Sequence, residues 1–313
     1  MSRLDDAELV ALLLAQRLVD DGAPPLKASE FWDVLSAIPY PGALLGLSAE
    51  GVRQAAGVDA EMAARIVARL DQATNFAFAL DEAQQTGLRV LSALSEDFPT
   101  TLREKLGRSA PPLLYALGDV GLLSHEGLGV VGSRSVSEAG AEVARSAAAN
   151  AVTAGLGVLS GGAKGTDRLA MNAALDAGGH VVGVLADSLL RTARDPQVRR
   201  SVIDGLVCLC SPYKPTAGFT VANAMGRNKL IYAMSTATLV VECEEGTGGT
   251  WAGAVEAIRG STAPVIAWTG PGAAPGNHAL VRQGALSLAR LNDLAAVCRT
   301  KAAPAPAQLG FSF

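Results

Sequence analysis

Short apolar runs recur through the second half of this chain, and their spacing constrains its fold more than any other feature. The runs are Leu128–Val131, Gly157–Leu159, His180–Leu185, Leu206–Cys210, Thr238–Val241 and Pro264–Trp268. Amphipathic stretches long enough for helices separate them, which is typical of βαβ units in a parallel sheet. We therefore predict an α/β fold whose ligands bind beyond the carboxyl ends of the strands.

The N-terminal part of the chain has helical periodicity instead. Apolar residues at three-to-four spacing mark four segments: Asp5–Val19, Ser29–Leu35, Ser48–Ala56 and Ala60–Ala79. A Gly turn joins the last two segments, as in helix-hairpin-helix DNA-binding modules and in many ordinary helical pairs, and both interpretations stay open. We predict a helical SAM-like or helix-hairpin-helix-like domain at residues 1–85, an α/β domain at 86–298 and a flexible Pro/Ala tail at 299–313.

Charge and cysteine usage limit the possible functions. The chain has 26 basic and 30 acidic residues, so nucleic-acid binding would need a local basic patch. No apolar run reaches the roughly 20 residues that span a bilayer, and the early acidic residues are unlike a signal peptide. We expect a cytoplasmic protein without membrane contact. Cys208 and Cys210 alternate in an apolar run without a completing metal-ligand pair, so we expect core thiols and neither metal nor cofactor.

Two glycine-rich segments follow predicted strands. In Gly132–Ser135, Gly132 allows a tight turn, amides at the next helix start can meet an anion, and Arg134 can fork onto a phosphate. Ser160–Asp167 has three glycines that permit close ligand approach, and Lys164 adds a positive charge. Neither segment has the spacing of a dinucleotide fingerprint or a P-loop. We expect Asp167 to cap the following helix.

A third polar segment, Gly226–Ile231, is predicted to lead into a helix. Arg227 and Lys229 flank an amide there, which suits phosphate contact better than base readout, although a solvated helix face gives the same pattern. A fourth glycine-rich turn, Gly246–Thr250, follows.

In this order the motifs resemble the DprA/Smf family, over roughly residues 85–270. The matching segments are Gly132-Ser133-Arg134, Ser160–Asp167, Arg227-Asn228-Lys229-Leu230-Ile231 and Thr247–Ala252. The resemblance implies an extended Rossmann-like domain that binds single-stranded DNA and forms a homodimer. It also implies delivery of the strand to a RecA-type recombinase during DNA uptake and recombination, without catalysis.

The resemblance carries the DNA-contact role to four basic positions, Arg134, Lys164, Arg227 and Lys229. We predict a phosphate-binding site that joins them to neighbouring loop residues, namely Gly132, Ser133, Ser160, Gly161, Gly162, Gly165 and Asn228.

Several positions depart from the family pattern. Lys164 replaces the usual Arg, Met171 stands where a His is common, and Arg191–Asp195 replaces a Tyr-Pro segment. The resemblance is thus to a divergent branch of the family, and we expect a role in defence or plasmid biology as an alternative to one in natural transformation.

An enzyme or a nucleotide-derivative sensor on the same fold is the alternative. Phosphoribohydrolases of this superfamily carry a Glu shortly after the G-G-x-G-T turn, but Trp251, Ala252 and Gly253 follow Thr250 here. Glu256 could serve only in another register. Separately, Gln308–Phe313 resembles a sliding-clamp-binding peptide on a Pro/Ala tether.

Overall fold

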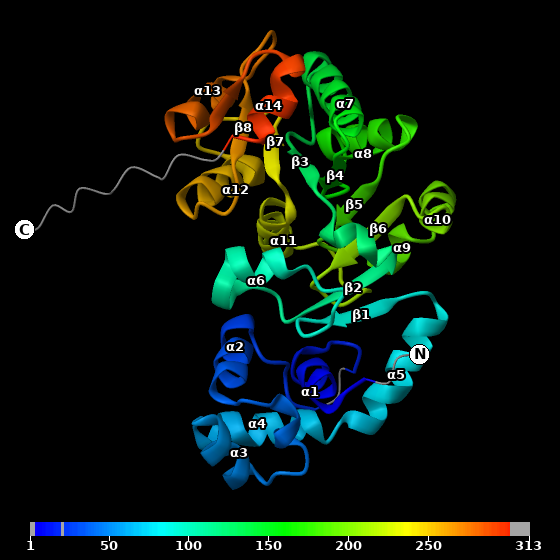
Figure 1. Ribbon diagram of the computed structural model, residues 1–313, viewed down its shortest axis with the longest axis vertical. Helices are drawn as coiled ribbons and strands as arrows, with labels where there is room; N and C mark the ends of the chain where they lie inside the picture. The colour runs from blue at the N-terminus through cyan, green and yellow to red at the C-terminus, as the bar shows by residue number, and fades with distance from the viewer. Residues whose placement is uncertain (1–3, 20–21, 301–313) are drawn as a thin grey trace, which may run out of the picture. The chain divides into compact units, whose positions relative to one another are not determined.

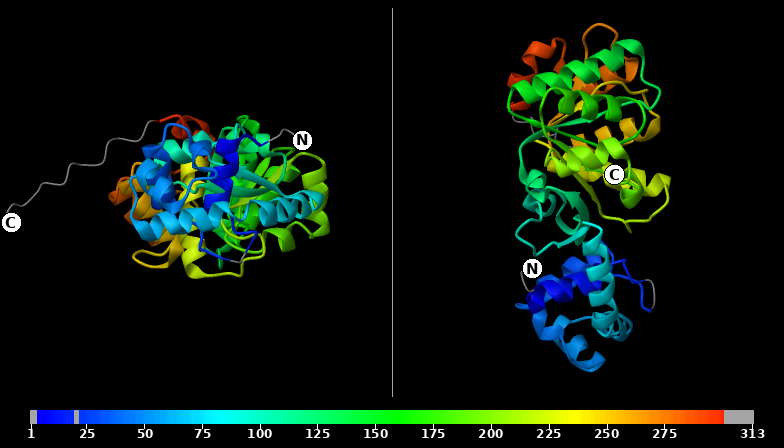
Figure 2. Two further views of the ribbon diagram at one scale, coloured as in Figure 1. Left: turned by 90° about the horizontal axis from the view of Figure 1, so that it is seen from below. Right: turned by 90° about the vertical axis from the view of Figure 1, so that its right-hand side faces the viewer.

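A computed structural model describes residues 4–19 and 22–300 (Figures 1 and 2). They form two compact units that alternate along the chain. The first comprises the described residues of Met1–Ser124, Ala186–Ile203 and Cys208–Phe219, and the second those of His125–Leu185, Asp204–Val207 and Thr220–Phe313. The domain boundaries expected after residues 85 and 298 stay a prediction. The proposed clamp peptide Gln308–Phe313 lies outside the described residues.

The helices of the first unit are α1 (Asp6–Ala15), α2 (Ala28–Ala37), α3 (Ala49–Ala56), α4 (Ala60–Leu70), α5 (Ala73–Gln85), α6 (Thr100–Leu106), α9 (Leu189–Thr192) and α10 (Pro196–Ile203), with short 3-10 turns at Pro41–Leu44, Gly107–Ser109 and Val120–Ser124. Helices α1 to α4 of the first unit match the four predicted helical segments, whereas α6, α9 and α10 were not predicted. The predicted helix Ala60–Ala79 is interrupted at Asp71 and Gln72, which lie between α4 and α5. Asp59 caps α4 by accepting from the Met62 amide at 2.8 Å.

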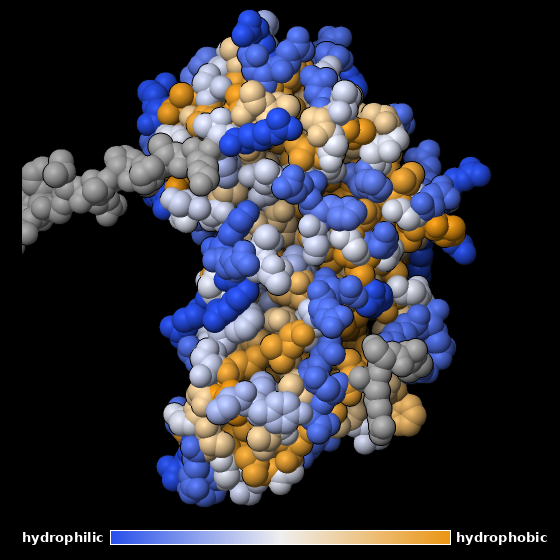
Figure 3. Space-filling view, viewed as in Figure 1, coloured by the Kyte–Doolittle hydropathy of each residue, from blue (hydrophilic) through white to orange (hydrophobic). Residues whose placement is uncertain are grey.

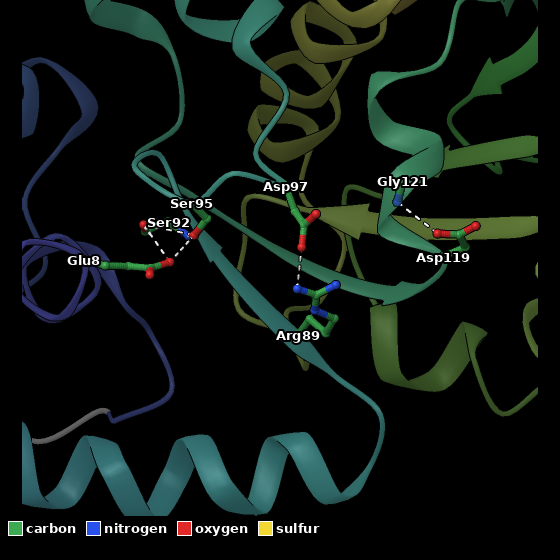
Figure 4. A network of polar contacts seen from close by, with 7 residues as sticks. All are labelled: Glu8, Arg89, Ser92, Ser95, Asp97, Asp119 and Gly121. Carbon is green, nitrogen blue, oxygen red and sulfur yellow. Dashed lines mark hydrogen bonds and ion pairs between the residues drawn. The ribbon is translucent and has the colours of Figure 1, made fainter. Parts of the chain in front are cut away.

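Helix α1 is the buried centre of this unit. Its residues Val10–Ala15 are buried, and the side chain of Arg69, only 1% exposed, donates to the carbonyl oxygens of Leu13 and Gln16 at 2.9 and 2.8 Å. These are orphan carbonyls at a helix C-terminus, so the guanidinium satisfies groups that would otherwise be buried without partners. Towards the other end of α1, Glu8 accepts from the hydroxyl of Ser95 (Figure 4).

The strands of the first unit are antiparallel. β1 (Arg89–Ser92) pairs with β2 (Leu113–Gly118), and β2 pairs with Cys208–Ser211 of β6 (Val207–Ser211). An ion pair of 2.6 Å between Arg89 and Asp97 braces the turn after β1 (Figure 4). β2 was not predicted, and the run that forms β6 was expected to pair only in parallel.

The second unit holds the predicted parallel sheet. Its strands are β3 (Gly127–Val131), β4 (Gly157–Ser160), β5 (Val181–Val184), β7 (Ala237–Val240), β8 (Val265–Trp268) and β9 (Leu286–Leu288). The pairings give the order β5-β4-β3-β7-β8-β9, and every pair is parallel. The predicted α/β class is therefore confirmed. Strand order reverses between β3 and β7, the point at which doubly wound sheets bind ligands.

Helices cover both faces of this sheet, with α7 and α8 on one side and α11, α12 and α13 on the other (Figure 1). They span Glu138–Thr153 (α7), Thr166–Asp176 (α8), Val221–Met234 (α11), Gly248–Arg259 (α12) and Pro275–Arg282 (α13), and α14 (Leu294–Cys298) follows a 3-10 turn at Leu291–Asp293. The buried face of α7 is largely alanine, which lets α8 approach closely. None of the helices within residues 4–19 and 22–300 combines the length and apolar character needed to cross a bilayer.

Asn277 of α13 holds together the carboxyl ends of two strands. It is fully buried, and its Nδ2 donates to the carbonyl oxygens of Val240, Val241 and Trp268 at 3.2, 2.9 and 2.9 Å. Its Oδ1 accepts from the Cys243 amide at 3.0 Å. One amide group therefore fixes the end of β7, where one of the predicted ligand loops begins.

Candidate nucleic-acid interface

The three glycine-rich segments meet beyond the carboxyl ends of β3, β4 and β7. The backbone amide and hydroxyl of Thr166 both donate to the carbonyl oxygen of Ser133, at 3.2 and 3.1 Å. The hydroxyl of Thr250 donates to the carbonyl oxygen of Gly132 at 3.1 Å. We call these contacts the loop clasp. They bring the first, second and fourth predicted segments into one constellation.

Two of the predicted site glycines make the loop clasp sterically possible. A Cβ at Gly132 would lie 2.5 Å from Oγ1 of Thr166. Gly165 has a φ of +87°, and a Cβ there would lie 2.6 Å from the carbonyl oxygens of both Ser133 and Arg134. These glycines permit one loop to approach another, whereas the sequence analysis assigned Gly132 to a tight turn and Gly165 to close ligand approach.

Three cations lie at the surface of these loops. Arg134 and Lys164 are exposed, as predicted for DNA contacts. Arg168, in the first turn of α8, is also exposed, and its Nε donates to the carbonyl oxygen of Gly162 at 3.2 Å. The sequence analysis did not single out Arg168, although its position directly after the glycine-rich loop was a usable signal.

Two predicted contact residues lie inside the unit. The Arg227 side chain is 6% exposed, and its Nη1 lies 3.7 Å from Oδ2 of Asp167. Ser160 is fully buried and its hydroxyl donates to the carbonyl oxygen of Val130 at 2.6 Å. Neither side chain reaches the surface of the unit, and the contact of both residues with phosphate stays a prediction.

The segment Gly226–Ile231 lies within helix α11, so the prediction that it leads into a helix is wrong. Positions two apart on a helix face different directions, so Arg227 points inward while Lys229 does not. Lys229 forms an ion pair of 2.8 Å with Glu256, and Nδ2 of Asn228 lies 3.5 Å from the carbonyl oxygen of Gly249. Arg227 therefore lies in the interior of the unit, whereas Asn228 and Lys229 contact residues of α12.

Glu242 occupies the helix start nearest the point of strand-order reversal. It follows β7, and its Oε2 accepts from the backbone amide and the hydroxyl of Ser137 at 3.1 and 2.5 Å. Ser137 is the N-cap of α7 and itself accepts from the Gly140 amide. A carboxylate therefore sits where the sequence analysis expected helix-start amides to meet an external anion.

Asp167, like Glu242, is a carboxylate that accepts a hydrogen bond from a backbone amide, here in the second glycine-rich loop. It is 6% exposed and accepts from the Ala163 amide at 3.3 Å, whereas the N-cap of α8 is Gly165. Burial raises the pKa of the Asp167 carboxyl, while the charge of Arg227 and hydrogen bonds from the loop amides act to lower it. Asp167 thus holds the loop and does not cap the helix as expected.

The start of α12 differs from the starts of α7 and α8, where a carboxylate accepts hydrogen bonds from nearby amides. Its N-cap, Thr247, makes no side-chain capping bond, and Gly248 and Gly249 are exposed. Backbone amides at such a helix start are suited to a phosphate group.

Other candidate chemistry was also located. All four cysteines are buried and free, which confirms the expected core thiols at Cys208 and Cys210. Within residues 4–19 and 22–300, no three His, Cys, Asp or Glu side chains are grouped to hold a metal ion. Glu256, the residue considered for hydrolase chemistry, forms the surface ion pair with Lys229.

Comparison with known sequences gives a consistent result. The family described as DNA recombination-mediator protein A matches residues 89–299. A protein named DNA processing protein DprA from Mycobacterium tuberculosis is 32% identical over 197 residues, covering 59% of this chain and 49% of the relative. Protein Smf from Escherichia coli is 29% identical over 208 residues, covering 65% and 54%. The chain thus spans about half the length of the curated relatives it matches.

Solved structures show the same fold. The X-ray structure of DNA processing protein A from Streptococcus pneumoniae aligns with a TM-score of 0.72 at 24% identity, covering 94% of this chain and 98% of that one. A structure of DNA processing protein A from Helicobacter pylori, described for its single-stranded DNA binding mode, aligns with a TM-score of 0.55 at 19% identity over 67% and 94% of the two chains.

Proposed function

The chain belongs to the DprA/Smf family of DNA recombination-mediator proteins, and from this premise we propose that it binds single-stranded DNA. The observation that carries the proposal is the pair of exposed cations, Arg134 and Lys164, on loops joined by the loop clasp. The uncapped start of α12 adds backbone amides at the same carboxyl edge of the sheet. Cations and amides on fixed loops suit a phosphate backbone of any sequence.

Electrostatics favour the binding of single-stranded DNA over the binding of a nucleotide at the point where the order of the β-strands reverses. Glu242 places a carboxylate there, at the N-terminus of α7, and this charge would repel a nucleotide phosphate bound in the usual doubly wound manner. A DNA backbone that follows the outer loops meets Arg134 and Lys164 first. We therefore place strand binding ahead of a nucleotide-sensor or phosphoribohydrolase role.

We further propose that the protein acts by binding and not by catalysis, as a cytoplasmic homodimer that passes its strand to a RecA-type recombinase. Membership of the recombination-mediator family supports this assignment.

The decisive experiment is anisotropy of a fluorescent oligo-dT across a salt series. We expect binding to weaken steeply with salt, and the double variant Arg134→Ala/Lys164→Ala to reduce the slope of log K against log[salt] by about 1.4, or about 0.7 per cation. The matched control is Arg145→Ala/Arg282→Ala, two exposed arginines that pair with Glu142 and Glu245. Absence of binding at low salt by folded protein would overturn the proposal.

The sequence also supports a second partner. We propose that Gln308–Phe313 binds a bacterial sliding clamp, since a Gln, an aliphatic residue and two spaced aromatics can anchor in a preformed pocket. Deletion of these six residues should abolish clamp co-purification, and undiminished co-purification would refute the idea.

A further inference from the structure

Arg227 and Asp167 form a buried ion pair beneath the second glycine-rich loop. Their side chains are 6% and 9% exposed, with Nη1 of Arg227 3.7 Å from Oδ2 of Asp167. Removing either partner would leave the other buried charge with less compensation, so the two groups depend on each other.

The loop between these charges is held from two directions. A Cβ at Gly161 would lie only 1.1 Å from Nη1 of Arg227, so the guanidinium occupies the space that any side chain at this position would need. Asp167 accepts from the Ala163 amide at 3.3 Å. The main chain from Gly161 to Ala163 is therefore fixed by a guanidinium packed against one residue and a carboxylate bonded to another. Lys164 is the next residue along the chain.

We propose that Arg227 and Asp167 are a positioning pair, which fixes the Gly161–Ala163 main chain and thereby places Lys164, without either side chain touching DNA. This inference rests on the proposed function, because it assigns the pair's role within that binding site. It also explains how an arginine in a motif associated with DNA binding can be almost wholly enclosed by protein.

Asp167→Asn gives the sharpest test, because two roles for Arg227 predict opposite signs. If Arg227 only positions the loop, Asp167→Asn weakens oligo-dT binding, on the order of tenfold, as does loss of residues that support a ligand-binding group elsewhere. If Arg227 contacts phosphate, the same substitution frees the guanidinium and strengthens binding. Stronger binding by Asp167→Asn would overturn the proposal.

The salt dependence provides a readout that loss of stability alone does not move. Arg227→Met should weaken binding while leaving the salt slope unchanged, whereas Arg134→Ala, a direct contact, should lower the slope by about 0.7. The double variant Asp167→Asn/Arg227→Met should lose less affinity than the sum of the two single losses, because both changes break the same ion pair. Arg227→Lys, which keeps the charge, should recover part of the affinity. A slope lowered by Arg227→Met contradicts the proposal.

Hydrogen exchange separates this inference from the proposed function. In DNA-free protein, we expect Arg227→Met and Asp167→Asn to speed amide exchange in Gly161–Ala163 while exchange in β8 stays slow. Unchanged exchange in the loop would overturn the positioning role. If the wild-type protein fails to bind oligo-dT, the proposed function fails, but this measurement still decides whether the pair fixes the loop.

A different observation concerns an arginine-rich surface of the first unit. Helices α9 and α10 and their connection carry four exposed arginines: Arg191, Arg194, Arg199 and Arg200. Asp187 pairs with Arg191 at 3.5 Å, and Asp195 is engaged by the Gln197 amide at 3.0 Å. In the described part of the chain, the side chains of the other three arginines make no ion pair or hydrogen bond. Figure 3 shows hydrophilic side chains interspersed with hydrophobic ones at the position of α10 in Figure 1.

This surface is anchored at one end and uncovered at the other. Leu189 is buried, and the amides of Ser188 and Leu190 donate to the carbonyl oxygens of Ala217 and Pro215 at 2.9 and 3.2 Å. Helix α10, in contrast, buries none of its eight residues, and Ile203 is 73% exposed. A helix this short gains little stability alone in water, so a bound partner would stabilise it.

We propose that α9 and α10 form a second surface for the phosphate backbone of single-stranded DNA. Arginine forks match phosphate geometry, and three of them here have no carboxylate to neutralise them. The proposal extends the proposed function to a separate part of the chain.

The test is the triple variant Arg194→Gln/Arg199→Gln/Arg200→Gln against the ion-paired control Arg53→Gln/Arg108→Gln/Arg282→Gln. We expect the salt slope for oligo-dT to fall by about 2 in the test variant only, and oligo-dT to slow amide exchange in α10. An unchanged slope and exchange would overturn the proposal. Slowed exchange with poly-glutamate but not with oligo-dT would also overturn it, in favour of an acidic protein partner. If affinity for oligo-dT falls in this triple variant but not in Arg134→Ala/Lys164→Ala, the site at the glycine-rich loops is rejected and the α9–α10 surface is retained.

Discussion

Glu242 accepts two hydrogen bonds from Ser137, one from its backbone amide and one from its hydroxyl, and so joins the end of β7 to the start of α7. The contact closes the point of strand-order reversal with a negative charge. It both stabilises a helix N-terminus and opposes the binding of an anion there.

Glu242→Gln should therefore change stability and binding in opposite directions. The free energy of unfolding should fall by about 0.3–1 kcal/mol, because the helix dipole loses its compensating charge. The affinity for oligo-dT should rise, because a negative charge near the bound DNA is removed. Urea unfolding and anisotropy measure the two effects. Glu142→Gln, an exposed change farther along α7, is the control, and a stability loss equal to that control would refute the interpretation.

Glu256→Gln should release Lys229 from its surface ion pair. Both side chains are about half exposed, at 42% and 50%, so the stability change should stay below about 1 kcal/mol. If the Lys229 side chain then contacts the bound DNA, the slope of log K against log[salt] for oligo-dT should steepen by about 0.7. An unchanged slope would remove Lys229 from the predicted contacts.

Asn277→Ala should be among the most destabilising single changes in the second unit. It leaves the buried carbonyl oxygens of Val240, Val241 and Trp268 without their amide donor, at a cost of about 3–5 kcal/mol. Urea unfolding measures the loss. Asn150→Ala removes one 3.4 Å hydrogen bond at a half-buried site and should cost under about 1 kcal/mol. Equal losses would mean that Asn277 does not brace the strand ends.

Stability should decline at alkaline pH because of the buried thiols. Burial raises the pKa of Cys210 to about 12 and that of Cys298 to about 11, whereas an unfolded thiol has a pKa near 8.5. The folded state then holds protons that the unfolded state releases, so the stabilisation is complete below about pH 8.5 and is lost as pH rises towards the folded pKa. Each thiol removes up to about 1.4 kcal/mol per pH unit.

Urea unfolding at about pH 8 and about pH 10 checks this decline, and Cys210→Val should make it shallower. An identical decline in that variant would assign the alkaline sensitivity to other groups.

Much of the fold followed from the sequence because buried parallel strands are short, uniformly apolar and separated by helices. All six predicted apolar runs from Leu128 to Trp268 became strands. β2, which follows two prolines, was not predicted, and three-residue β9 is too short for a periodic signal. The antiparallel pairing of β2 with β6 depends on tertiary contacts that no local pattern encodes.

The candidate site was less predictable, because a motif gives the type of a side chain but not its environment. Arg134 and Lys164 lie on the surface, but Arg227 points inward to a carboxylate distant in sequence. The role of Glu242 was hidden for the same reason, since its partner Ser137 follows a different strand.

The bonds of the loop clasp fix the loops without using the charged side chains that the loops present to a ligand. Its bonds run between threonine groups and main-chain carbonyl oxygens, and neither Arg134 nor Lys164 contributes a side chain to them. Substitution at those two positions can therefore alter the charge offered to a ligand while the scaffold is inherited unchanged. Such a surface can diverge in what it binds long before its fold diverges, as expected of a lineage that keeps an architecture and changes its ligand.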